Sequence, residues 1–180
     1  MRRNKRNTNA KKIVWDFLLD NPDRRFYLTQ VAQKTKVSDS TVQQILEKKV
    51  KKNLIKKEKL GNLSFYFLNQ NNLLVKEEKI LRTLKIIKPL VDQLKDWSQK
   101  IILFGSAASG ENTAKSDFDL FILSNEKDRI YEIFSRSKIK NKVSLVVKNF
   151  LEWLQIKEKD KFFFSQVNKG KILWERNEAI

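Results

Sequence analysis

Two acidic residues inside an apolar run constrain the fold of the second half of this chain. The run "KIILFG" is short, apolar and ends in Gly105, which predicts a buried strand. The run "SDFDLFIL" predicts a second strand that contains Asp117 and Asp119. Alternate side chains of a strand point to the same face. We therefore expect the two carboxylates to project together, while Phe118 and Leu120 pack on the other side.

This pair of carboxylates predicts a cation site. Neighbouring carboxylates repel each other and lose hydration on burial unless a cation lies between them. The chain has no cysteine and no histidine, which excludes disulfides, thiolate or imidazole metal ligands and Ser-His catalysis. Carboxylate oxygens favour a hard cation, so the expected metal is Mg²⁺, with Mn²⁺ as the alternative.

The turn after the first strand predicts a phosphate-binding segment. Gly105 lets the backbone approach a ligand closely, and Ser106 is expected to open a helix whose amides face phosphates. A phosphate cradle beside a metal-binding carboxylate pair is the layout that nucleotidyl transfer requires. Strand and helix patterns then alternate to the end of the chain, which predicts a small mixed α/β sheet.

The stretch "GSAASGENTAKSDFDLFIL" resembles the signature of the DNA polymerase beta-like nucleotidyltransferases, in particular the minimal nucleotidyltransferases. Their pattern is Gly-Ser, ten residues and Asp-x-Asp, and the resemblance covers about residues 98–180. It implies that Asp117 and Asp119 are catalytic metal ligands. The nucleotide-binding residues that it implies are Gly105, Ser106, Lys115 and Ser116.

Two positions depart from the family pattern. The family often has arginine where Ser109 stands, and Lys115 is the candidate substitute for its charge. Active members commonly carry a third carboxylate on the next strand, where this chain has Ser144 in "KVSLVV". Glu152 would replace it only if the chain folded back there. A serine does not act as a metal-bridging base at neutral pH, so binding is expected while turnover is in doubt.

Basic residues are concentrated in the first part of the chain. The formal net charge is +17, and residues 1–74 hold 17 Lys/Arg against 6 Asp/Glu. Residues 1–10 are expected to form a flexible basic arm, and a helix is expected from Lys11 to Leu19. Such a balance favours a polyanionic partner, although a lysine-rich surface without one is the alternative.

Residues 11–74 resemble a winged helix-turn-helix domain. The segment "YLTQVAQKTKVSDSTVQQILEKKVKKNLI" predicts two helices joined by a tight turn, and "KKEKLGNLSFYFLN" predicts a β-hairpin around Gly61-Asn62. The resemblance implies binding to double-stranded DNA, with the third helix in the major groove; a fold used only for protein contacts is the alternative. The expected DNA-binding residues are Ser40, Thr41, Gln43, Gln44, Lys48, Lys56, Lys57 and Lys59.

Between these regions, residues 75–97 predict a linker helix. Apolar residues recur at spacings of four and three, and Pro89 is expected to kink or split the helix near Lys88. Packing onto one or both domains is the expected role of the stripe, and a homodimer seam is the alternative. The predicted fold class is α+β: a winged helix domain, a linker helix and a polymerase-beta-like α/β domain at residues 98–180.

Two functions fit these patterns. In the first, the protein transfers a nucleoside monophosphate from a nucleoside triphosphate to an acceptor hydroxyl with Mg²⁺; the resemblance offers a toxin of the HEPN ribonuclease class as one acceptor. In the second, it is a DNA-binding transcriptional regulator, as antitoxins can be, whose degenerate transferase-like domain senses nucleotide or dimerises. No run approaches the roughly 18 apolar residues of a membrane span, so a cytoplasmic protein is expected.

Overall fold

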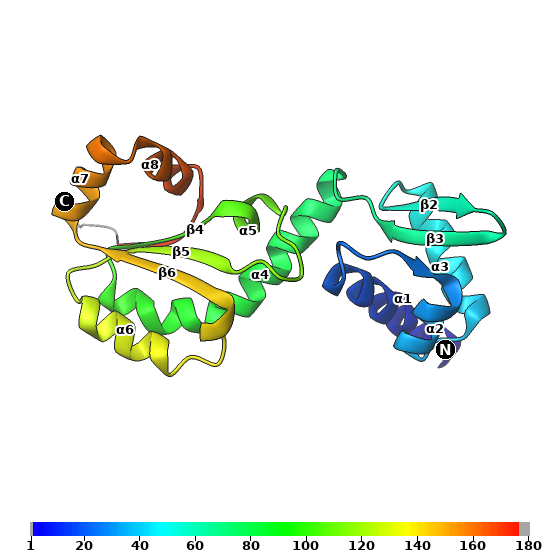
Figure 1. Ribbon diagram of the computed structural model, residues 1–180. Helices are drawn as coiled ribbons and strands as arrows, with labels where there is room; N and C mark the ends of the chain where they lie inside the picture. Colours follow the sequence, from blue (N-terminus) through cyan, green and yellow to red (C-terminus); the bar gives the residue numbers. More distant parts are fainter. Residues whose placement is uncertain (1, 177–180) are drawn as a thin grey trace. The chain divides into compact units, whose positions relative to one another are not determined.

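The chain divides into two compact units, Met1–Glu77 and Glu78–Ile180. A computed structural model describes residues 2–176 (Figure 1). No helix among these residues has the length and apolar character needed to cross a membrane.

Unit 1 begins with three helices. They are α1 (Arg2–Asp20), α2 (Leu28–Thr35) and α3 (Asp39–Lys51). The start of α1 differs from the sequence prediction, which placed a flexible arm over residues 1–10. No glycine or proline precedes Asp20, so nothing in this stretch breaks a helix once Lys11–Leu19 are helical. Between α2 and α3, Lys36 adopts a left-handed φ of 55°, which ends α2 and forms the tight turn.

A three-stranded antiparallel sheet completes unit 1. Its strands are β1 (Phe26–Tyr27), β2 (Ile55–Leu60) and β3 (Leu63–Leu68), in the order β1-β3-β2. The predicted hairpin is confirmed: Leu60 pairs with Leu63 across the two-residue turn, where Gly61 has φ +60°.

The helices and the sheet of unit 1 share one apolar core. Its fully buried side chains include Val14 of α1, Val31 of α2 and Leu46 of α3, and the sheet adds Ile55 and Tyr66. The helical spacing of the apolar residues in α3 places Val42, Ile45 and Leu46 on the buried side, as predicted.

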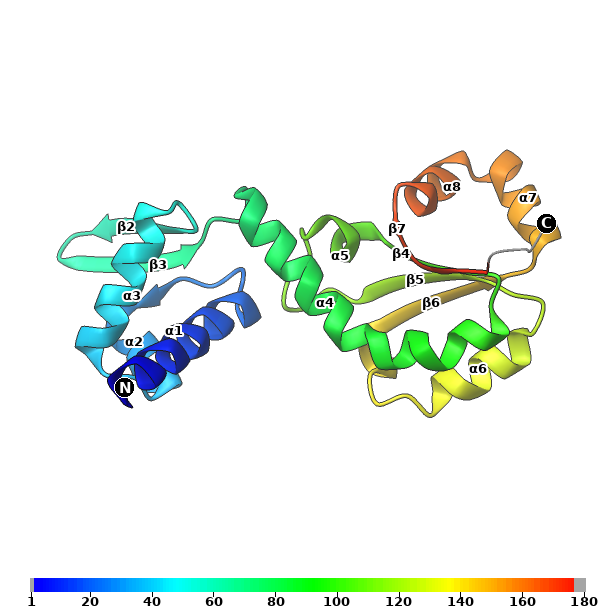
Figure 2. The same cartoon turned by 180° about the vertical axis from the view of Figure 1, so that it is seen from behind.

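Helix α4 (Leu73–Leu94) contains Pro89 and continues through it to a short 3₁₀ turn at Lys95–Trp97. The helix is bent rather than split, as Figure 2 shows. Its residues Ile87, Leu90, Val91 and Leu94 are buried in the core of unit 2. Most of the apolar stripe of this helix is therefore buried within unit 2. A homodimer formed through the stripe remains a prediction.

Unit 2 contains a four-stranded mixed sheet in the order β6-β5-β4-β7. Strand β5 runs antiparallel to β4 and parallel to β6, and β7 runs antiparallel to β4. The elements are β4 (Lys100–Phe104), α5 (Gly105–Ser109), β5 (Phe118–Leu123), α6 (Lys127–Ser135), a 3₁₀ turn at Lys140–Lys142, β6 (Val143–Lys148), α7 (Phe150–Lys159), α8 (Lys161–Asn168) and β7 (Lys171–Glu175). The alternation of strands and helices predicted from the sequence is confirmed.

Each face of this sheet carries its own core. Helices α4 and α6 lie on one face, and α7 and α8 lie on the other (Figures 1 and 2). The first core contains Leu103 and Leu120 of the sheet with Ile130 of α6. The second contains Phe121, which packs on Trp153 of α7 with ring centroids 4.5 Å apart. The two central strands, β4 and β5, are buried on both sides, which explains why they read as nearly continuous apolar runs.

Candidate functional site

The candidate site of unit 2 is built around the turn that follows β4. Gly105 has φ +68°, a conformation that favours glycine. A Cβ atom added there would lie 2.5 Å from Oδ2 of Asp119, so a larger residue would force this carboxylate to move. Phe104, the last residue of β4, pairs with Asp119 in the sheet. The Gly-Ser and Asp-x-Asp segments, which are separated by ten residues in the sequence, are therefore in direct contact.

The two aspartates lie at the start of β5. Asp119 is within the strand and half-buried, whereas Asp117 directly precedes Phe118, the first strand residue, and is exposed. Phe118 and Leu120 belong to the core on the α4 and α6 face, as the alternation predicted. The placement of both acids inside the strand was thus correct only for Asp119.

Ser144 is the neighbour of Asp119 on the adjacent strand. The parallel register of β5 and β6 pairs the two residues, and the Ser144 side chain hydrogen-bonds to the carboxylate. Burial raises the pKa of Asp119, and the charge of Asp117 raises it further, while the Ser144 hydrogen bond opposes both effects. The position where the family pattern has a third acid is therefore beside Asp119, as the sequence indicated, and it holds a neutral hydroxyl.

Glu152 does not supply the missing acid. It lies in the first turn of α7, where its carboxylate accepts a hydrogen bond from the Asn149 amide and pairs with Lys127. The Lys127 hydrogen bond and the Asn149 amide lower the pKa of Glu152. Within residues 2–176, no group of three or more acidic side chains is placed to hold a metal ion. The candidate site therefore contains two carboxylates, those of Asp117 and Asp119.

A hollow of about 420 Å³ opens beside the Gly105 turn. Its lining residues come from the α5 region and from the end of α8: Gly105, Ser106, Ala108, Ser109, Glu111, Gln166, Lys169 and Gly170. Of the four predicted nucleotide-binding residues, Gly105 and Ser106 line it. Lys115 and Ser116 are not among the lining residues; they form a turn in which the Ser116 hydroxyl accepts a hydrogen bond from the Thr113 amide, 2.9 Å away.

Sequence reasoning missed Gln166 and Lys169 as site residues. They lie about fifty residues after Asp119, and no spacing rule relates them to the Gly-Ser segment. The one available signal was "NKG" directly before the last strand, because a glycine at such a turn indicates close backbone packing.

In unit 1, α3 presents a polar surface. Ser40, Gln43, Gln44 and Lys48 are exposed, as predicted. Thr41 is half-buried, and its hydroxyl accepts a hydrogen bond of 2.9 Å from Ser38. Gln43, Gln44 and Lys48 are therefore available to a partner. The hydroxyls of Ser40 and Thr41 contact that of Ser38, at 3.5 Å and 2.9 Å.

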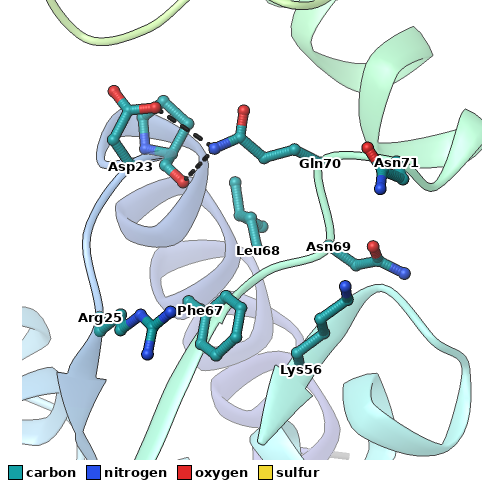
Figure 3. A pocket seen from close by; sticks show the side chains of 9 residues that line it. Asp23, Arg25, Lys56, Phe67, Leu68, Asn69, Gln70 and Asn71 are labelled. Carbon is teal, nitrogen blue, oxygen red and sulfur yellow. Dashed lines mark hydrogen bonds between the residues drawn. The ribbon is translucent and has the colours of Figure 1, made fainter.

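The three lysines of β2 divide between the two faces of the sheet. Lys57 forms an ion pair with Glu47 of α3 at 2.7 Å and therefore lies on the side of the sheet that faces α3. Lys59 lies on the same side, because it follows Lys57 by two residues along the strand. Lys56 lies on the opposite face. It lines a hollow of about 280 Å³, in which the Arg25 guanidinium lies 4.7 Å from the centre of the Phe67 ring (Figure 3). The sequence prediction named all three lysines of the hairpin as DNA-binding residues, and strand alternation places Lys56 on the other face from Lys57 and Lys59.

Comparisons with known proteins bear on unit 2. The chain matches the family model described as polymerase beta, nucleotidyltransferase, over residues 85–179, more than half of its length. A proposed nucleotidyltransferase from Sulfolobus solfataricus is 20% identical, with a TM-score of 0.42 over 62% of this chain and 97% of that one. HmgR of Pseudomonas aeruginosa is 13% identical, with a TM-score of 0.32 over 69% of this chain and 47% of that one. A search among curated proteins finds no match.

Proposed function

Because the chain belongs to the polymerase beta nucleotidyltransferase family, we propose that unit 2 binds a nucleoside triphosphate with Mg²⁺ and that unit 1 binds double-stranded DNA, so that the protein is a nucleotide-sensing regulator. The observation that carries the nucleotide site is the contact between the Gly105 turn and Asp119. This contact joins the phosphate-binding segment of the family to its carboxylate pair.

In this proposal, Asp117 and Asp119 hold the metal ion, and the Gly105-Ser106 turn receives the phosphates. The two carboxylates suit Mg²⁺ or Mn²⁺, because both ions prefer oxygen ligands and share them with triphosphate oxygens. A bound metal ion would neutralise phosphate charge and relieve the repulsion between the two aspartates.

Ser144 favours sensing over turnover. A catalytic base must accept a proton from the attacking hydroxyl at neutral pH, and a serine hydroxyl does not do so. Glu152, the other candidate, is engaged with Lys127 and the start of α7. The site thus retains residues for binding a metal-bound nucleotide and lacks the base that would make transfer fast.

We propose that unit 1 is a winged helix-turn-helix domain. Its three helices and its hairpin follow the order of that fold, and α3 exposes the polar side chains Gln43 and Gln44 with Lys48. Glutamine amides match the hydrogen-bonding edge of adenine in the major groove. The excess of positive charge in residues 1–74 supports binding to phosphates.

Calorimetric titration of the full chain with each of the four common ribonucleoside triphosphates, with and without Mg²⁺, tests the nucleotide site. We expect Mg²⁺-dependent binding that weakens about tenfold or more in Asp119→Asn, since loss of a charged ligand removes a charge-assisted contact.

DNA selection from a random pool, with and without the bound nucleotide, tests the regulator. Equal affinity for all DNA sequences, or affinity that nucleotide does not change, would contradict it.

Nucleotidyl transfer to an acceptor hydroxyl is the second candidate function. The intact Gly105 turn and the Asp117–Asp119 pair favour it. The acceptor class suggested by family resemblance is a HEPN-type toxin, which we keep as a proposal. Incubation of the protein with labelled triphosphate, Mg²⁺ and candidate acceptors tests it, with Asp117→Asn as the inactive control.

Ser144→Asp tests the reason given for slow transfer. The register places residue 144 beside Asp119, so an aspartate there would complete a three-carboxylate site. We expect transfer to be faster, and Mg²⁺ binding tighter by about tenfold, because a third carboxylate adds a charged oxygen ligand. Wild-type protein that transfers label as fast as Ser144→Asp would show that the serine does not limit the reaction.

A further inference from the structure

The hollow beside the Gly105 turn has a second wall, formed by residues that follow α8. Gln166 lies in the last part of that helix, and Lys169 and Gly170 connect it to β7. Lys171, the first residue of β7, pairs with Leu103 of β4, two residues before Gly105. The sheet therefore brings the end of α8 to the same place as the phosphate-binding turn.

Gly170 fixes this second wall. A Cβ atom at Gly170 would lie 2.6 Å from the Leu103 carbonyl oxygen, 2.6 Å from Cγ2 of Ile102 and 2.9 Å from the Val167 carbonyl oxygen. The turn is therefore packed directly against β4. The Lys169 amide bonds to the Ser165 carbonyl oxygen at 3.1 Å, which closes the helix end. The backbone of Lys169 is thus bonded to the end of α8 and lies next to a turn packed against β4, at the edge of the hollow.

Lys169 is the only cation among the residues that line the hollow, within the part of the chain that the structure describes. Its ammonium group forms no ion pair or hydrogen bond with those residues, whereas Glu111, the other charged lining residue, is engaged. The Ser109 hydroxyl donates a hydrogen bond to the Ser106 carbonyl oxygen at 3.2 Å. An anion in the hollow would therefore meet one uncommitted positive charge.

We propose that Lys169 binds the phosphate chain of a nucleoside triphosphate that occupies this hollow. The proposal rests on the proposed nucleotide-binding function of unit 2 and adds the residue that supplies positive charge from the protein. The Gly105 turn contacts the phosphates from one side, and the Lys169 ammonium group contacts them from the other. A lysine makes charge-assisted hydrogen bonds to phosphate oxygens as a compact charge on a flexible stem. In this proposal, the positive charge that contacts the phosphates comes from Lys169, near the end of unit 2. It does not come from position 109, where the family often has arginine, or from Lys115.

Titration of the full chain with Mg²⁺ and the best-binding triphosphate, in wild type and in Lys169→Gln, tests this assignment. We expect Lys169→Gln to weaken triphosphate binding about tenfold or more, because one charge-assisted contact is lost. Lys169→Arg should restore most of the affinity. Lys161→Gln removes the same charge from the exposed first residue of α8 and should leave the affinity unchanged. Two further probes are the matching nucleoside, which has no phosphates, and inorganic triphosphate. Lys169→Gln should weaken binding of inorganic triphosphate and leave binding of the nucleoside unchanged.

Three results would overturn the assignment. If wild type binds triphosphate and Lys169→Gln binds it equally well, the nucleotide site stands and Lys169 is not part of it. The same conclusion follows if Lys115→Gln alone weakens binding. If the wild-type protein binds none of the triphosphates with Mg²⁺, the proposed nucleotide-binding function fails, and this inference fails with it. Circular dichroism of each variant confirms that a loss of binding is not a loss of folding.

Discussion

At the scale of single residues, the site depends on the absence of a side chain at Gly105. Asp119 lies where a Cβ atom at this position would project, so a larger residue would have to displace the carboxylate. The sequence predicted close backbone approach at Gly105, but toward a ligand. Contact with Asp119 itself depends on the pairing of β4 with β5, which no local pattern reveals.

Gly105→Ala should destabilise unit 2 by about 2 kcal/mol or more, since the strain of a positive φ adds to a steric clash. Gly61→Ala is the matched control, because Gly61 has φ +60° and nothing lies within 4 Å of the added Cβ atom. The control should cost only the strain, about 1 kcal/mol. Denaturant unfolding measures both; equal losses would argue against the close contact with Asp119.

Asp119→Asn should stabilise the metal-free protein at pH 7, because it removes a desolvated charge next to Asp117. The Asp119 carboxylate is fully ionised only above its raised folded-state pKa, so the gain in stability of Asp119→Asn over wild type reaches its full size above that pKa. It should shrink as the pH falls through the folded-state pKa and vanish below the unfolded value of about 3.9. Unfolding in EDTA across this pH range measures it. A variant less stable than wild type at pH 7 would contradict the account.

At the scale of elements, strand alternation decides which lysines of β2 share a surface with α3. Lys57 pairs with Glu47 on α3, and Lys59 lies on the same side, whereas Lys56 is on the other face. The hairpin itself was predictable from Gly61-Asn62 between two strand-like runs. Which face its lysines occupy was not, because β2 is polar nearly throughout and its pattern does not distinguish an inner from an outer face.

If α3 enters the major groove, Lys59→Ala should weaken DNA binding and lower the salt-dependence slope by about 1, the value for one lost phosphate contact. Lys56→Ala removes the same charge from the opposite face and should change neither quantity. Fluorescence anisotropy at several salt concentrations measures both variants. An equal effect of the two substitutions would mean that DNA does not approach from the α3 side.

At the scale of the whole molecule, the separate cores of the two units explain why motifs predicted so much of the fold. In each unit, short-range patterns specify helices and strands that pack mainly within that unit. The site was predictable where it lies in one continuous segment, from Gly105 to Asp119. Lys169 and Gln166 were not predictable, because only the pairing of β7 with β4 brings the end of α8 to that segment.

Separate cores also predict separate unfolding. Leu46 is fully buried in unit 1, and Leu46→Ala should destabilise that unit by about 2–5 kcal/mol through the cavity left in its core. Unit 2 should keep its stability. Hydrogen exchange followed by mass spectrometry resolves the two units, with Leu120→Ala as the reciprocal variant in unit 2. Equal loss of protection in both units would mean that they unfold as one.

The central claim is that the Gly105 turn and the two aspartates form a metal–nucleotide site. A crystal structure of the protein with Mn²⁺ and a non-hydrolysable nucleoside triphosphate, phased to show the anomalous signal of the metal, tests it most directly. The account predicts Mn²⁺ bound by Asp117 and Asp119, with the triphosphate in the hollow between Gly105 and Lys169. Metal bound elsewhere, or a triphosphate outside this hollow, would contradict it.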